Sequence, residues 1–85
     1  MNQPLPSLSA LRAFETTARH LSMTRAAAEL HVTAGAVSLQ VRDLEEAIGL
    51  PLLERKPRQL VLTATGADYA ASLGSAFRLI REATE

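Results

Sequence analysis

Two helix-forming segments, joined by only a few residues, constrain the fold of this 85-residue chain more than any other feature. The first begins after Ser22, runs from Met23 to Leu30 and contains three consecutive alanines. Alanine favours a helix more strongly than any other residue, and its small side chain lets a second helix approach closely. We therefore expect a short helix that another helix crosses at close range, with Ala27 at the crossing.

The second segment begins at Thr33, a good helix N-cap, and ends before Gly49, a natural helix stop. Its apolar residues recur at helical spacing and share one face: Val37, Val41, Leu44 and Ile48. An alanine-rich helix followed so closely by an amphipathic one is typical of a helix-turn-helix. The residues expected to fill the angle between the two helices are Leu30, Val32, Val37 and Val41.

The other face of the second helix is predicted to be free to enter a DNA major groove, which is wide enough for a helix. We call this helix the recognition helix; the residues on that face are Ala34, Gly35, Ser38, Leu39, Gln40 and Arg42. For Arg42 the alternative is an ion pair with Glu45 or Glu46. His31 stands in the turn where glycine is usual, so we expect it to adopt a positive φ unless the turn is built differently.

A basic turn follows between two short segments of β character. Residues 52–63 are therefore predicted to form a hairpin, which we call the wing. Arg55, Lys56 and Arg58 place three of the nine basic residues within four positions of it. On a hairpin beside a helix-turn-helix, such residues can meet phosphates or enter the minor groove. The alternative is a solvated turn without a partner.

Two further helices flank this central unit. Ser7 is a candidate N-cap for the first, which is expected to end near Arg19 and His20. Thr63 is expected to cap the last, whose roughly 30 Å length exceeds what so small a body needs for its own core. Apolar residues recur along this last helix at heptad-like intervals, and we expect them to form a dimerisation surface: Tyr69, Leu73, Ala76, Phe77 and Ile80. For Tyr69 and Phe77 the alternative is a place in the core.

Composition excludes several other functions. Nine basic and nine acidic residues give no net charge, so any DNA binding must come from local arrangement. The chain has no cysteine, and its two histidines lack an acidic cluster at metal-ligand spacing, so we expect no metal and no cofactor. The sequence has no activated nucleophile and no glycine-rich phosphate loop, so no catalytic residue and no enzyme activity are predicted.

The same composition indicates where the protein resides. No apolar run is long enough to span a membrane. The first four residues also lack the basic-then-apolar order of a signal peptide. We therefore expect a cytoplasmic protein.

Five stretches of the chain closely resemble the amino-terminal domain of LysR-type transcriptional regulators. They are LRAFE (11–15), LSMTRAAAELHVT (21–33), GAVSLQVRDLE (35–45), LPLLER (50–55) and LVLTATG (60–66). The segment ARHLS (18–22) is similar to the branch that contains the glycine-cleavage activator and the β-lactamase regulators. The resemblance covers essentially the whole chain.

The resemblance implies a mainly α fold: a winged helix-turn-helix over residues 1–64, with the helix-turn-helix at about 23–42, and a linker helix for dimerisation over 65–85. It implies sequence-specific binding of double-stranded DNA by a bacterial, nucleoid-associated regulator. It also implies an antiparallel homodimer through the linker helix, and often a tetramer in the complete protein. The family's effector-binding domain, which would hold any small-molecule effector, is expected to be absent from this chain.

Individual site residues follow from the resemblance where the chain matches the family. Thr24 and Arg25 lie in the segment that resembles the family's phosphate-holding part. The threonine hydroxyl, the arginine guanidinium and the N-terminus of a helix are all groups that bind an anion well. Thr33, Ser38 and Gln40 match polar positions of the recognition helix. Arg58, in the wing, resembles the arginine that reaches the minor groove.

Two residues depart from the family's pattern. Ala34 stands where glutamine is frequent, and Leu39 stands where arginine or another polar donor is frequent. Both can touch a thymine methyl group, but neither can make the hydrogen bonds that discriminate a base. Specificity is then expected to depend on Ser38, Gln40, DNA shape and the wing. The competing hypothesis is a winged helix used for protein association, which the zero net charge and these two apolar residues favour.

Overall fold

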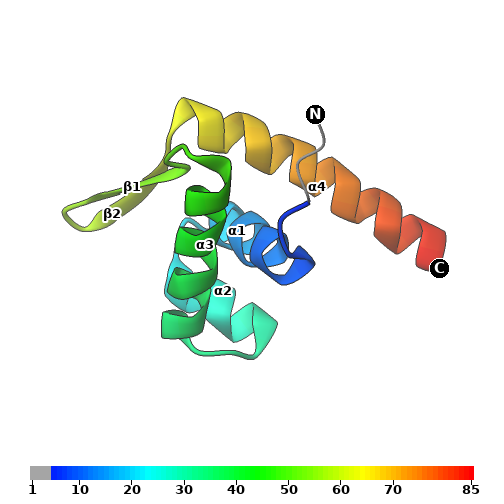
Figure 1. Ribbon diagram of the computed structural model, residues 1–85. Coiled ribbons are helices and arrows are strands. Elements are labelled where there is room, and N and C mark those ends of the chain that lie inside the picture. The colour runs from blue at the N-terminus through cyan, green and yellow to red at the C-terminus, as the bar shows by residue number, and fades with distance from the viewer. Residues whose placement is uncertain (1–4) are drawn as a thin grey trace.

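The computed structural model describes residues 5–85, so the first four residues, on which the signal-peptide expectation depends, lie outside the described residues. Within 5–85 the chain forms four helices and one antiparallel hairpin (Figure 1). The elements in chain order are α1 (Leu8–His20), α2 (Met23–Leu30), α3 (Ala34–Ile48), β1 (Leu53–Lys56), β2 (Gln59–Leu62) and α4 (Ala64–Thr84). The predicted mainly α winged helix-turn-helix with a long final helix is confirmed.

Each helix begins at the hydroxyl residue that the sequence predicts as its N-cap. The side-chain oxygens of Ser7, Ser22, Thr33 and Thr63 accept hydrogen bonds of 2.9–3.1 Å from backbone N–H groups three residues later. These bonds satisfy amide groups that have no acceptor within the helix. The local sequence therefore determines where all four helices start.

The core forms around α1, which packs against α2, α3 and α4. Phe14 of α1, Leu44 of α3 and Leu52 just before β1 are the largest side chains that the core buries almost completely. Thr17 is buried as well, and its hydroxyl donates a 2.8 Å hydrogen bond to the Ala13 carbonyl. Glu15 and Thr16 of α1 are buried too, and within residues 5–85 no buried side-chain nitrogen or oxygen lacks a hydrogen-bond partner.

The alanines of α2 are buried where this helix packs against α1 and α3. Ala26 and Ala27 belong to the same hydrophobic cluster as Val37 of α3. The expectation for Val32 is wrong, because this residue is 50% exposed. It lies in the turn after the left-handed His31 and lines a surface hollow instead of filling the angle.

The wing is anchored to the start of α4. Its strands pair in register from Leu53 opposite Leu62 to Lys56 opposite Gln59. The Thr63 hydroxyl donates to the Pro51 carbonyl at 2.8 Å, and the Thr63 N–H donates to the Leu52 carbonyl at 3.1 Å. Gly66, one turn into α4, lies so close that a Cβ there would overlap the Leu52 carbonyl oxygen. The wing and α4 are thus joined backbone to backbone.

The first half of α4 belongs to the core. The ring of Tyr69 stacks on that of Phe14 with centroids 6.0 Å apart, and burial raises the pKa of the Tyr69 hydroxyl. Leu73 is buried in the same cluster. These two members of the heptad-like set therefore pack within the chain.

The second half of α4 extends beyond the body (Figure 1). Phe77 is partly buried there, whereas Ala76 and Ile80 are exposed, as is Leu79 beside them. Among residues 5–85 there is no helix that combines the length and apolar character needed to cross a membrane.

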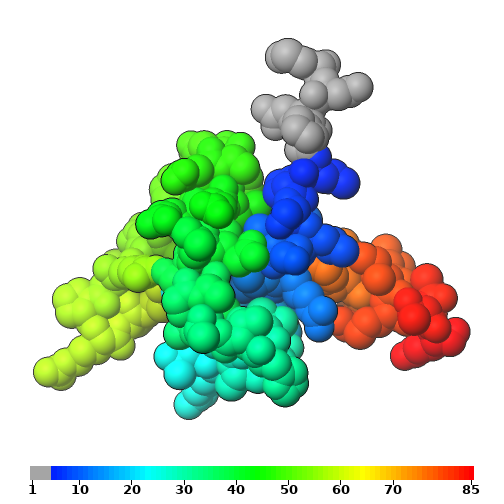
Figure 2. All heavy atoms as spheres, turned by 60° about the horizontal axis from the view of Figure 1, so that its bottom comes forward, coloured from blue at the N-terminus to red at the C-terminus, as the bar shows by residue number. Residues whose placement is uncertain are grey.

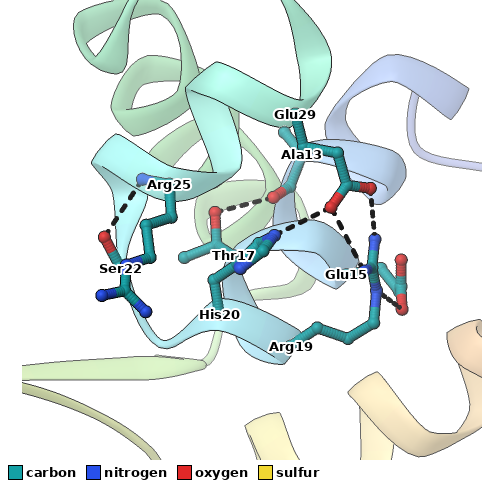
Figure 3. A network of polar contacts seen from close by, with 8 residues as sticks. All are labelled: Ala13, Glu15, Thr17, Arg19, His20, Ser22, Arg25 and Glu29. Atoms are coloured by element: carbon teal, nitrogen blue, oxygen red, sulfur yellow. Dashed lines mark hydrogen bonds and ion pairs between the residues drawn. The ribbon is translucent and has the colours of Figure 1, made fainter.

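A polar network joins the end of α1 to α2 (Figure 3). Arg19 donates from Nε to Glu15 at 2.9 Å and from its terminal nitrogens to both carboxylate oxygens of Glu29, at 2.7 and 3.3 Å. His20 Nε2 lies 2.8 Å from Glu29 Oε1. The hydrogen bonds from Arg19 and then from His20 lower the pKa of Glu29 to about 2. The network holds the first helix of the helix-turn-helix against the central helix.

The lowered pKa of Glu29 predicts an acid-dependent stability. A carboxyl with a depressed folded-state pKa stabilises the fold above its ordinary pKa, and this contribution is lost as the pH falls from about 4.5 towards about 2. Because Glu29 is partly exposed, the effect is modest. Urea unfolding at several acid pH values measures the free energy of unfolding. This free energy should fall less steeply with decreasing pH for Glu29→Gln than for the wild type. A control is Glu82→Gln, which removes only a 4.0 Å pair with Arg78; equal declines in the wild type and Glu29→Gln would contradict the assignment.

Candidate nucleic-acid interface

The turn before the recognition helix is built as the sequence predicts. His31 ends α2 with φ 59° and donates its N–H to carbonyls of the last turn, so a non-glycine residue holds the left-handed position. Thr33 then caps α3, accepting a bond from the Ala36 N–H at 3.1 Å. This short turn leaves the first half of α3 at the surface.

The predicted face of the recognition helix is exposed along its middle and half-buried at its edges. Ala34, Gly35, Leu39 and Arg42 are exposed, Leu39 by 49%. Ser38 and Gln40 are half-buried on opposite edges. Ser38 faces the wing, where it contacts Arg55, whereas Gln40 lines a hollow of about 220 Å³ towards α1. The two polar residues therefore border the face from opposite sides.

Charge is unequally distributed along α3. Its first half carries no charged residue, whereas Asp43 and Glu46 are exposed on its second half. Arg42 lies at the boundary, and within the described chain it forms no ion pair with either neighbouring glutamate, so the alternative proposed for it is not observed. Glu45 instead accepts bonds from the Leu52 and Leu53 N–H groups at 2.8 and 3.2 Å. Only the first half of α3 suits a polyanion.

The tip of the wing presents Arg58 in a strained backbone conformation. Pro57 fixes a negative φ, and Arg58 follows with φ 63°, which is the pattern of a type II turn and favours glycine at the second position. Arg58 is exposed. Lys56, two residues earlier, forms an ion pair with Glu54 in which Nζ lies 3.9 Å from Oε2. Arg58 therefore occupies a position whose backbone conformation favours glycine.

The start of α2 adjoins the same surface. Thr24 and Arg25 are exposed, and the Ser22 hydroxyl caps the Arg25 N–H at 3.1 Å (Figure 3). Met23 links this end to the wing, because its sulfur lies 3.5 Å from the Arg55 guanidinium. Figure 2 shows α2, α3 and the wing together on one side of the molecule, with α4 pointing away. The fold thus gathers the three segments predicted to contact DNA.

The distribution of unpaired arginines explains how a neutral chain can bind an anion. Arg19 and Arg78 are held by carboxylates, whereas within residues 5–85 six arginines have no ion pair. Arg81 lies near the end of α4. The other five lie on α1, the start of α2, α3 or the wing: Arg12, Arg25, Arg42, Arg55 and Arg58. Positive charge is therefore concentrated locally although the total is zero.

Two residues of this surface were missed by sequence reasoning. Arg12 lies on α1 beside Gln40, on the rim of the 220 Å³ hollow, and Met23 meets Arg55. The amphipathic pattern of α1 does indicate that Arg12 is exposed, since Leu11 and Phe14 are buried. The pattern does not indicate that Arg12 lies near α3, because this depends on the angle at which α1 and α3 cross.

Comparison with known proteins agrees with this geometry. The profile of the family described as "Bacterial regulatory helix-turn-helix protein, lysR family" matches residues 8–67. The glycine cleavage system transcriptional activator of Escherichia coli K12 is 49% identical over 84 residues, which are 99% of this chain and 28% of that protein. The transcriptional activator AmpR of Pseudomonas aeruginosa is 53% identical over 77 residues, covering 91% of this chain and 26% of its own length.

A solved structure supports the same assignment. The BenM DNA-binding domain, crystallised with catB site 1 DNA, superposes with a TM-score of 0.86 at 28% identity and covers 92% of this chain and 87% of that one. The chain spans little more than a quarter of the two curated relatives, and it aligns with nearly all of this isolated domain. The 85 residues therefore belong to the lysR family of bacterial regulatory helix-turn-helix proteins and have the winged helix-turn-helix fold of that family's DNA-binding domains.

Proposed function

We propose that this chain binds double-stranded DNA sequence-specifically, as the DNA-binding domain of a bacterial transcriptional regulator. The observation that carries the proposal is the exposed first half of α3, free of acidic residues and placed beside a wing whose Arg55 and Arg58 lack ion pairs within the described chain. A helix of this kind fits the major groove, and the wing then reaches the adjacent phosphates and minor groove. The similar BenM domain has been solved with DNA bound.

The proposed contacts fall into two groups. The cationic and hydroxyl groups at the edges hold phosphates and set the orientation: Thr24, Arg25, Arg42, Arg55 and Lys56. The remaining residues face bases, with Arg58 in the minor groove and the recognition helix in the major groove: Thr33, Ala34, Gly35, Ser38, Leu39 and Gln40. The apolar members of this second group contact thymine methyl groups.

The proposal divides the chain into a DNA-binding part, residues 1–64, and a linker helix, residues 65–85, that pairs with a second copy. The exposed end of α4 carries the pairing surface, Ala76 and Ile80 with Leu79 beside them, while Tyr69, Leu73 and Phe77 support it from within the chain. The much longer relatives leave room for an effector domain and for tetramer formation in the complete protein. Such a regulator, with no catalytic step, acts at the nucleoid in the bacterial cytoplasm.

Arg58→Gly tests the wing's part in this function. Glycine removes a left-handed strain of about 1 kcal/mol, so the melting temperature is expected to stay level or rise slightly. Affinity for duplex DNA is expected to fall, and the slope of log affinity against log salt concentration should shrink by about one. Fluorescence anisotropy at several salt concentrations measures both quantities.

The matched control is Arg78→Ala, which removes an exposed arginine from α4. Its salt slope is expected to equal that of the wild type. If Arg58→Gly leaves affinity and slope unchanged while Tm shows a folded protein, the wing does not contact DNA. No measurable binding of the folded wild-type protein to any duplex at low salt would favour protein association instead.

A further inference from the structure

A hydrogen bond connects the wing directly to the recognition helix. Leu53 is buried at the start of β1, and Arg55, two residues later, leaves the strand on the same side. Its Nη2 donates to Ser38 Oγ at 2.9 Å and also contacts the Met23 sulfur at 3.5 Å. The guanidinium therefore spans from the wing to the edge of the groove-facing surface.

No carboxylate within residues 5–85 forms an ion pair with Arg55, although Glu45 lines the same notch. This notch has a volume of about 360 Å³, and Ser38 and Arg42 line it as well. The Glu45 carboxylate accepts bonds from the Leu52 and Leu53 N–H groups. The remaining N–H groups of Arg55 are thus available to a phosphate while Nη2 holds Ser38.

The bond restricts what the Ser38 hydroxyl can do. A serine hydroxyl has one hydrogen to donate and two lone pairs that accept, whereas a guanidinium only donates. When Arg55 occupies one lone pair, the O–H bond of Ser38 is polarised and becomes a better donor, because hydrogen bonds in a chain strengthen one another. Ser38 is half-buried, at the edge of the face that α3 exposes.

We propose that Arg55 is a positioning residue that presents Ser38 as a hydrogen-bond donor to one base of the operator. This inference rests on the proposed DNA-binding function and specifies which chemistry the recognition helix prefers. In the major groove guanine offers the acceptors N7 and O6, adenine offers N7 and thymine offers O4, whereas cytosine offers only the N4 donor. At the position that Ser38 faces, cytosine is therefore disfavoured relative to the other three bases.

The test is a double-mutant cycle on a duplex selected for binding by the wild-type protein. Ser38→Ala removes the hydroxyl, and Arg55→Gln replaces the guanidinium with an amide that both donates and accepts. Affinities are measured for a panel of duplexes with single base-pair changes. The wild type is expected to disfavour cytosine at one position by about fivefold or more, and each single variant should reduce that preference below about twofold. The double variant should show no further loss of preference.

Arg58→Gln is the matched control, because Arg58 belongs to the same hairpin and forms no bond to α3 in the described structure. It is expected to weaken binding without changing the preference against cytosine at the position that Ser38 faces, and to add to the effect of Ser38→Ala. If Arg55→Gln instead behaved like Arg58→Gln, Arg55 would contact phosphate without positioning Ser38. This result would overturn the inference while leaving the proposed function intact. A wild-type protein that binds no duplex at all would instead overturn the proposed function. Circular dichroism melting confirms that each variant is folded.

Discussion

Replacing Gly66 by alanine is expected to destabilise the domain by about 3 kcal/mol, near the upper end of the range for overpacked positions. A Cβ at residue 66 would overlap the carbonyl oxygen of Leu52 and lie 2.9 Å from its carbonyl carbon. These are backbone atoms, so they can move only if α4 separates from the base of the wing. Thermal unfolding should show a Tm lower by about 12 °C or more.

Gly74 provides a control in the same helix. The nearest atom to a Cβ there is a Glu15 side-chain oxygen at 3.9 Å, an ordinary contact. Alanine is a better helix former than glycine, so Gly74→Ala is expected to raise the free energy of unfolding by up to about 1 kcal/mol. A Gly66→Ala protein as stable as the wild type would show that the wing and α4 do not meet as closely as described.

Ile80→Glu is expected to convert the proposed dimer into monomers and to lower operator affinity about 100-fold or more. Ile80 is 51% exposed on the part of α4 that extends past the body, so a charge there does not enter the chain's own core. In a dimer the introduced charge would lie in the apolar contact between the two copies of α4. A monomer binds one half-site without the gain in effective concentration that a second, linked half-site provides.

Sedimentation equilibrium and DNA affinity measured on the same samples test this prediction. Ala71→Glu is the matched control, because Ala71 is exposed and lies about 180° around the helix from Ile80. It should leave both quantities unchanged. An Ile80→Glu protein that remains dimeric would remove the end of α4 from the interface. Leu73 is unsuited to this experiment, since it is buried and a charge there would unfold the domain.

Sequence reasoning predicted the features that depend on local chemistry. Ser and Thr residues determine the start of each helix because their hydroxyls reach an N–H three residues later, and no distant contact is needed. For His31 the position in the turn, where glycine is usual, left two possibilities, a positive φ or a different turn, and the structure has the positive φ. The face of α3 was predictable because helical periodicity alone determines which residues share a side.

Features that depend on long-range packing could not be predicted. Heptad-like spacing is the same for packing within a chain and between chains, so it did not show that Tyr69 and Leu73 belong to the chain's own core. The hydrogen bond between Arg55 and Ser38 joins residues that are 17 positions apart in the sequence, and it depends on how the wing packs beside α3. The close approach of Gly66 to Leu52 likewise results from the docking of α4.

Selection of bound duplexes from a random pool tests the DNA-binding proposal most directly. We expect successive rounds at low salt to enrich a two-fold symmetric sequence, with half-sites one or more helical turns apart, because a symmetric dimer presents two recognition helices. A folded wild-type protein that enriches no sequence above background would contradict sequence-specific DNA binding and would leave protein association as the use of this winged helix.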